Sequence, residues 1–122
     1  MLTKIKNAQA VKKENVKVNY SKMNESVLKI LSSGEYIDGF EKKGQGAKRV
    51  LDIKLKYENN VGAIDEIKLI SKPSRHIYTG YKEIKLVKRG HGLMVISTPN
   101  GVMNGRDARK MKVGGEILFE IW

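Results

Sequence analysis

The feature that most restricts the fold of this chain is a strict alternation of apolar and polar residues over positions 51–57. The apolar positions are Leu51, Ile53, Leu55 and Tyr57, and the polar positions between them are Asp52, Lys54 and Lys56. Side chains of a β-strand point alternately to its two faces, so this period separates the two sets. The pattern predicts an antiparallel strand with one face buried and the other in water.

Helical and extended patterns precede this strand. Apolar spacing, a serine N-cap and glycine turns predict a helix over 2–13, a strand over 16–20, a helix from Ser21 to Gly34, a strand over 36–40 and a turn at 44–46. The apolar stripe of the second helix is expected to contain Met23, Val27, Ile30 and Leu31. The first half is therefore expected to follow the order α-β-α-β-β.

The second half is richer in short extended segments, and the boundary between the halves lies near residues 59–67. After a break at Asn59, Asn60 and Gly62, the patterns predict extended segments over 64–70 and 75–79, followed by a short helix or turn over 81–89. A buried strand over 93–96 and a turn at 98–101 come next. The chain then forms a short helix, capped by Asn104 and ended by Gly114-Gly115, and a last strand over 117–121.

The chain carries 24 lysine and arginine residues against 13 aspartate and glutamate residues, which gives a net charge of +11. Such an excess favours a polyanionic partner, and nucleic acid is the commonest one. Residues 1–66 hold 13 basic and 9 acidic side chains, whereas residues 67–122 hold 11 and 4. The main anion-binding surface is therefore expected in the second half.

A membrane partner is not expected. The sequence has neither a basic amphipathic helix nor a lipid anchor, and no apolar run approaches the ~20 residues that span a bilayer. The first residues lack the apolar stretch of a secretion signal. The chain has no cysteine, which excludes disulfides and thiolate metal sites. These features predict a protein of the cytosol or of an organelle matrix.

Few residues suit catalysis or metal binding. The two histidines, His76 and His91, are isolated and lack a metal ligand at i, i+4. Asp65-Glu66 fits a solvated turn better than a pair of catalytic carboxylates, because neighbours in a strand point to opposite faces. Gly44-Gln45-Gly46 lacks the spacing of a phosphate loop and fits a hairpin turn. We therefore expect no catalytic residue, no metal, no cofactor and no small-molecule substrate.

Two polar turns near the C-terminus are better candidates for function. Ser97 to Met103 follows the predicted buried strand, and Gly114-Gly115-Glu116 leads into the last strand. If those strands pair, the turns lie close together and offer hydroxyls, an amide, backbone donors and one acid. Such groups suit base edges and the 2′-hydroxyls of an RNA minor groove. The alternative interpretation is that Ser97 and Thr98 only cap a turn and that Gly114-Gly115 only ends a helix.

Four motifs give the chain a resemblance to a known family. They are Thr3 to Gln9, Ile70 to Tyr78, Gly92 to Met103, and the segment from Asp107-Ala108-Arg109-Lys110 to Val113-Gly114-Gly115-Glu116. In this order and spacing the sequence resembles the bacterial-type small-subunit ribosomal protein eight family over essentially its whole length.

The resemblance implies an α+β protein of two small domains, residues 1–66 and 67–122, whose C-terminal domain grips an irregular RNA helix. It implies direct binding to the central domain of small-subunit ribosomal RNA, a role in subunit assembly, neighbouring ribosomal proteins as partners, and a cytoplasmic or organellar ribosome as the location. By likeness the specificity contacts are Ser97, Thr98, Gly101, Gly115 and Glu116. Tyr78 would pack on a ribose or base, and Thr3, Lys4 and Asn7 would contact a second RNA segment.

The chain departs from the family pattern in two places. Pro99-Asn100 stands where the family usually has Ser-Lys, so a hydroxyl, a backbone N–H and a charge are absent there. Asn100 keeps the capacity to hydrogen-bond and remains a candidate contact. The residues that usually precede the first helix, including an Asp-Pro pair, are also absent, and the helix start is expected to be less well anchored.

Phosphate attraction is expected from six cations, Lys72, Arg75, Arg106, Arg109, Lys110 and Lys112. Each phosphate contact adds about 0.7–0.9 to the slope of affinity against salt. Two other functions stay open at this point. An RNA-processing enzyme would need a base or metal, for which only the histidines are available. A DNA-binding module would need residues 104–111 to enter a major groove, although no partner helix is evident.

Overall fold

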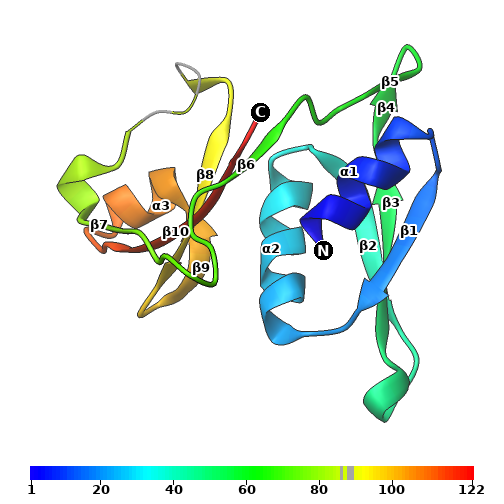
Figure 1. Ribbon diagram of the computed structural model, residues 1–122, viewed down its shortest axis with the longest axis horizontal. Coiled ribbons are helices and arrows are strands. Elements are labelled where there is room, and N and C mark those ends of the chain that lie inside the picture. Colours follow the sequence, from blue (N-terminus) through cyan, green and yellow to red (C-terminus); the bar gives the residue numbers. More distant parts are fainter. Residues whose placement is uncertain (86, 88–89) are drawn as a thin grey trace. The chain divides into compact units, whose positions relative to one another are not determined.

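The computed structural model describes residues 1–85, 87 and 90–122. Its chain divides into two compact units, Met1–Ile64 and Asp65–Trp122. Both units combine helices with antiparallel sheet, as the ribbon view shows (Figure 1). The predicted α+β class is therefore confirmed. No helix in the described part of the chain is long and apolar enough to cross a bilayer.

The N-terminal unit packs two helices against one face of a sheet (Figure 1). Its elements are α1 (Leu2–Ala10), β1 (Asn15–Asn19), α2 (Lys22–Ser33), β2 (Ile37–Lys43), the 3₁₀ turn η1 (Gly46–Lys48), β3 (Val50–Leu55), β4 (Tyr57–Glu58) and β5 (Val61–Gly62). The sheet has the antiparallel order β1–β3–β2, and β4 and β5 form a separate hairpin. The N-cap prediction for α2 is confirmed, because Ser21 Oγ accepts from the Asn24 amide at 3.0 Å.

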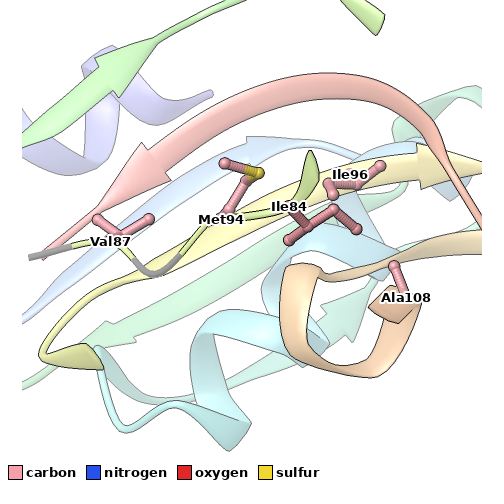
Figure 2. Packing of buried hydrophobic residues seen from close by; sticks show 5 residues of the cluster. All are labelled: Ile84, Val87, Met94, Ile96 and Ala108. Atoms are coloured by element: carbon pink, nitrogen blue, oxygen red, sulfur yellow. The ribbon is translucent and has the colours of Figure 1, made fainter. Parts of the chain in front are cut away.

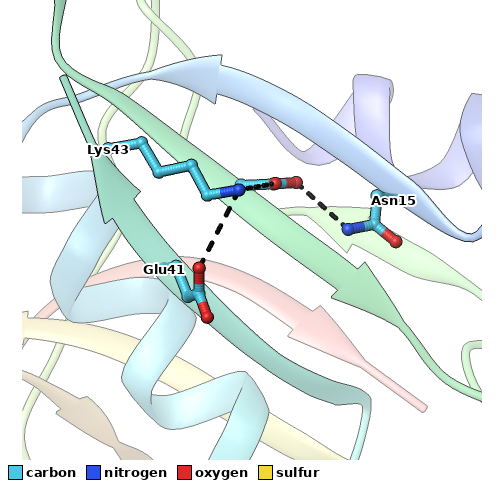
Figure 3. Close-up of polar contacts among 4 residues, drawn as sticks. Asn15, Glu41 and Lys43 are labelled. Carbon is cyan, nitrogen blue, oxygen red and sulfur yellow. Dashed lines mark hydrogen bonds and ion pairs between the residues drawn. The ribbon is translucent and has the colours of Figure 1, made fainter.

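The alternation in β3 separates a core face from an open polar face. Leu51, Ile53 and Leu55 are buried, but the predicted strand over 51–57 is too long, because β3 ends at Leu55 and Tyr57 belongs to β4. On the open face, Lys43 Nζ donates to the Asp52 carboxylate at 2.9 Å and Asn15 Nδ2 donates to it at 3.3 Å (Figure 3). The hydrogen bond from Lys43, followed by that from Asn15, lowers the pKa of Asp52, and the same bond raises the pKa of Lys43. The cation of Lys43 is therefore already paired within the protein.

The C-terminal unit is mostly sheet with one short helix in its described part. Its elements are β6 (Ile67–Leu69), β7 (Tyr78–Thr79), the 3₁₀ turn η2 (Tyr81–Glu83), β8 (Leu93–Thr98), β9 (Gly101–Asn104), α3 (Gly105–Lys110) and β10 (Gly115–Ile121). The strand order is β6–β10–β8–β9, and β7 also pairs with β10.

Helix α3 is held on the sheet by a small apolar cluster. Ala108 lies with Ile84, Val87, Met94 and Ile96, and all of these are buried (Figure 2). The N-cap prediction is again confirmed: Asn104 Oδ1 accepts from the Asp107 amide at 2.8 Å. One face of α3 is thus fixed to the core, which leaves the opposite face in solvent.

Of the two predicted glycine ends of helices, the one at Gly34 is confirmed and the one at Gly114-Gly115 is wrong. Gly34 is the C-cap of α2, with a φ of −83°, and Glu35 after it takes the left-handed conformation with a φ of 63°. Helix α3 ends at Lys110, four residues before Gly114, and Lys112 takes the left-handed conformation. Gly114 precedes β10 and Gly115 begins it, and the close approach of neighbouring backbone requires glycine at both positions. The first helix also ends early, at Ala10 rather than residue 13.

Other differences concern the short extended segments. Only β6 and β7 form strands within 64–70 and 75–79, because the chain turns tightly between Lys72 and Arg75. Strand β9 was not predicted. Met23 is 46% exposed, so its place in the apolar stripe was wrong. Within the segment 81–89, η2 provides a short helical turn, and residues 86 and 88–89 lie outside the described part.

The charge comparison changes at the observed boundary. The unit Met1–Ile64 carries 13 basic and 7 acidic side chains, and the unit Asp65–Trp122 carries 11 and 6. The net charges are therefore +6 and +5, because Asp65 and Glu66 fall in the second unit. Charge alone does not distinguish the two units, so a binding surface must be argued from the arrangement of individual residues.

Candidate nucleic-acid interface

Three of the predicted contact residues form a row across the C-terminal sheet. Glu116 of β10 pairs with Ser97 of β8 on one side and with Tyr78 of β7 on the other. Residues that pair directly in antiparallel strands direct their side chains to the same face. Tyr78 is 70% exposed, and the Glu116 side chain is 22% exposed. The row therefore presents a phenol ring, a carboxylate and a hydroxyl side by side.

The glycines at the start of β10 allow this close pairing. A Cβ atom added to Gly115 would lie 2.1 Å from the Ser97 carbonyl oxygen, and one added to Gly114 would lie 2.3 Å from the Thr79 carbonyl oxygen. A side chain at either position would collide with backbone. The expectation that the two polar turns lie close together is thus confirmed for the described residues.

Thr98 stabilises the turn between β8 and β9. The residue is only 9% exposed. Its hydroxyl donates to the Gly101 carbonyl at 2.8 Å and accepts from the Asn100 amide at 3.1 Å. Gly101 has a φ of +112°, which L-residues with side chains rarely adopt. Thr98 therefore caps the turn, as the alternative interpretation of these residues holds. The Thr98 hydroxyl still has one acceptor position left for a ligand.

The departure at Pro99-Asn100 falls at the exposed tip of this turn. Pro99 takes the first central position, where a fixed φ near −65° favours the turn. The Asn100 amide supports the turn from within, since it donates to Thr98. Pro99 and Asn100 are therefore compatible with the closed turn between β8 and β9.

Glu116 is hydrogen-bonded to His76, and no sequence pattern connects these two residues. His76 Nδ1 lies 2.8 Å from Glu116 Oε2. This hydrogen bond lowers the pKa of Glu116, although partial burial opposes it; the charge of His76 and a hydrogen bond from Ser71 lower it further. Glu116 is therefore ionised at neutral pH and can only accept hydrogen bonds.

Five of the six predicted phosphate-binding cations lie on two short structural elements, and the sixth, Lys112, follows α3 in the left-handed conformation. Lys72 and Arg75 pair in an isolated antiparallel bridge, with both N–H···O distances at 2.9 Å. Arg106, Arg109 and Lys110 are exposed on α3 at i, i+3 and i+4, the spacing that places side chains on one helix face. This face of α3 lies opposite the buried Ala108.

Thr3, Lys4 and Asn7 belong to the other unit. All three are exposed on α1, and Ile5 and Ala8 are buried beneath it. Positions 3, 4 and 7 again fall on one face of a helix. The first helix thus presents a hydroxyl, a cation and an amide together.

Comparison with known proteins assigns the chain to a family. The family model described as Ribosomal protein S8 matches residues 1–122. The chain belongs to the ribosomal protein S8 family. It is 43% identical over 122 residues to the small ribosomal subunit protein uS8 of Nautilia profundicola, covering 99% of this chain and 93% of that protein. It is 42% identical over 130 residues to the protein of the same name from Thermus aquaticus, covering 100% and 94%.

Membership of the ribosomal protein S8 family makes this chain a structural ribosomal protein and not an enzyme. In bacteria, uS8 proteins are components of the small ribosomal subunit in the cytoplasm. The RNA-processing alternative is therefore dismissed on family grounds. Among the described residues, no group of three or more histidine, aspartate and glutamate side chains is arranged to hold a metal ion.

Sequence reasoning missed the roles of His76 and Ser71 in this family member. His76 stands 40 positions from Glu116, so no local pattern connects them. The contact becomes visible only in the structure, where Tyr78, two positions after His76, pairs with Glu116.

Proposed function

We propose that this protein binds the central domain of small-subunit ribosomal RNA directly and acts early in assembly of the subunit. The observation that carries the proposal is the row of Tyr78, Glu116 and Ser97 on paired strands, beside the turn closed by Thr98. Charge gives attraction to any RNA, whereas this row offers groups that discriminate between RNA surfaces.

The chemistry of the row suits the wide minor groove of an RNA helix. An ionised Glu116 accepts hydrogen bonds from a base amino group or a ribose 2′-hydroxyl, but it repels phosphates. Ser97 can donate or accept. The exposed ring of Tyr78 can stack on a ribose or an unpaired base. Together these groups favour an irregular RNA segment in which base edges are accessible.

The cations orient the protein on the RNA backbone. Lys72, Arg75, Arg106, Arg109 and Lys110 are exposed and are expected to contact phosphates. Thr3, Lys4 and Asn7 would contact a second RNA segment. Neighbouring small-subunit proteins would complete the surroundings. The protein would thereby hold an RNA junction in the geometry that later assembly steps need.

Substitution of Glu116 tests the proposal. Removal of an acid from an RNA-binding protein strengthens general attraction to phosphates, so weaker binding is diagnostic of a direct contact. We expect Glu116→Ala to weaken binding to a central-domain fragment about tenfold, as for a hydrogen bond to a charged group. Binding to a scrambled RNA of equal length should not weaken. Filter binding at fixed salt measures both affinities.

Two matched variants complete the experiment. Glu120→Ala removes an acid from the same strand and should leave the preference for the fragment intact. Lys110→Ala should weaken binding to both RNAs alike and reduce the salt slope by about 0.7–0.9. Equal losses on both RNAs for Glu116→Ala would contradict the proposal, as would tighter binding of duplex DNA than of the fragment.

A further inference from the structure

The hydrogen bond between His76 and Glu116 occupies one of the two ring nitrogens of the imidazole. An ionised carboxylate only accepts, so Nδ1 of His76 carries the hydrogen that joins it to Glu116 at 2.8 Å. The hydrogen bond at one ring nitrogen fixes the state and orientation of the other. The His76 side chain is 54% exposed, more than twice the exposed fraction of Glu116. Nε2 is therefore the nitrogen left for a ligand.

Backbone hydrogen bonds fix the position from which His76 acts. The turn before it is closed by the paired bonds between Lys72 and Arg75. After it, the Ile77 amide donates to Ser71 Oγ at 3.0 Å, and the Ile77 carbonyl accepts from the Ile117 amide at 2.9 Å. His76 thus lies between two anchored positions rather than on a free loop.

We propose that His76 is an RNA contact that responds to pH: Glu116 holds Nδ1, and Nε2 binds a phosphodiester oxygen when the ring is protonated. The proposal rests on the RNA-binding function proposed above and adds a residue and a regulation to the same site. Neutral imidazole offers Nε2 as an acceptor, which no phosphate can use. Imidazolium offers an N–H donor with a positive charge, and phosphate binding then takes up a proton.

Charged and titratable groups lie near His76 on the neighbouring strands and on the turn before it. Glu116 faces it from β10, and its lowered pKa keeps it ionised through the range near neutrality. Tyr78 lies opposite Glu116 on β7, and Lys72 and Arg75 belong to the turn that leads to His76. Phenol, ammonium and guanidinium groups ordinarily do not change charge between pH 5.8 and about 7.8, whereas imidazole does. These cations would bring phosphates to Nε2 at every pH in that range.

Two substitutions separate the two ring nitrogens. In His76→Asn, the side-chain amide can replace the Nδ1–H donor to Glu116 but cannot titrate. In His76→Ala, both functions are lost. His91→Asn removes the other histidine of the chain and is the matched control. Because His76 and His91 are both exposed, all three variants are expected to fold, and far-UV circular dichroism verifies this.

The experiment measures affinity for a central-domain rRNA fragment at about pH 5.8 and 7.8 at constant salt. We expect the unmodified protein and His91→Asn to bind about tenfold more tightly at the lower pH, the size of one added charge-assisted contact. His76→Asn should match the unmodified protein within about twofold at the higher pH and lose the gain at the lower pH. His76→Ala should be weaker at both values.

Each contrary result has a distinct meaning. Equal pH dependence in the unmodified protein and in His76→Asn would overturn the contact at Nε2. Full affinity of His76→Ala at the higher pH would overturn the positioning of Glu116 by Nδ1. If the unmodified protein did not prefer the fragment over scrambled RNA at either pH, the proposed function itself would fail.

Discussion

At the scale of single residues, backbone contacts decide which groups of the C-terminal turns remain for a ligand. The Thr98 hydroxyl donates its hydrogen to the Gly101 carbonyl, and Thr98 is nearly buried. Ser97, one position earlier, points to the opposite side of the strand and joins the row with Glu116. Two adjacent hydroxyls therefore have different tasks, one in the turn and one on the exposed face.

Gly115 offers a direct test of how closely β8 and β10 must approach. Gly115→Ala would place a Cβ atom 2.1 Å from the Ser97 carbonyl oxygen, so one strand must shift. We expect a loss of about 1–3 kcal/mol in the free energy of unfolding, as for other overpacked sites. Gly80→Ala is the matched control, because its Cβ would meet nothing within 4 Å and its φ is −81°. Urea denaturation followed by Trp122 fluorescence measures both; an equal effect of the two substitutions would contradict the argument.

At the scale of elements, each α-helix in the described part of the chain ends in the same motif. After α2, the Glu35 amide donates to the Ser32 carbonyl and the Tyr36 amide donates to the Leu31 carbonyl, with Glu35 in the left-handed conformation. The same pair of bonds follows α1, with Lys12 left-handed, and α3, with Lys112 left-handed. This is the Schellman motif, in which glycine is the usual left-handed residue.

A glycine at the left-handed position should therefore stabilise the protein. A non-glycine residue there carries a conformational penalty of about 1–2 kcal/mol, which glycine avoids at a smaller entropic cost. We expect Glu35→Gly to raise the free energy of unfolding by up to about 1 kcal/mol. Lys29→Gly, in the exposed interior of α2, should lower it by about 1 kcal/mol. Thermal unfolding compares the two, and a loss of stability in Glu35→Gly would refute the account.

The helix ends also show what sequence could and could not predict. The N-caps Ser21 and Asn104 were predicted because a cap depends on a residue three positions away. The role of Gly114-Gly115 was mistaken because the reason for glycine there lies in Thr79 and Ser97, which are distant in the chain. In the candidate site, the closeness of the two turns could be predicted, because it follows from strand pairing. The hydrogen bond between His76 and Glu116 could not be predicted, because it depends on where the Lys72–Arg75 turn places the imidazole ring of His76.

At the scale of the whole molecule, the described chain contains two compact units that each have their own sheet and their own buried residues. Their net charges are similar, so both can be attracted to RNA. The two units differ, however, in the spectroscopic signals that report on their unfolding. The only tryptophan of the chain, Trp122, packs against the cluster beneath α3 in the C-terminal unit. Tryptophan fluorescence therefore reports on that unit, while far-UV circular dichroism reports on both.

Core substitutions can determine whether the units unfold separately. Ile53 lies in the central strand of the N-terminal sheet and Ile96 in the cluster beneath α3, and both are fully buried. Truncation of a buried isoleucine to alanine costs about 2–5 kcal/mol, and each unit has its own core to absorb that loss. We expect Ile53→Ala to move part of the circular dichroism transition to lower urea while the fluorescence midpoint stays. Ile96→Ala should move the fluorescence midpoint first. A single transition, coincident by both probes in both variants, would show instead that the two units unfold as one.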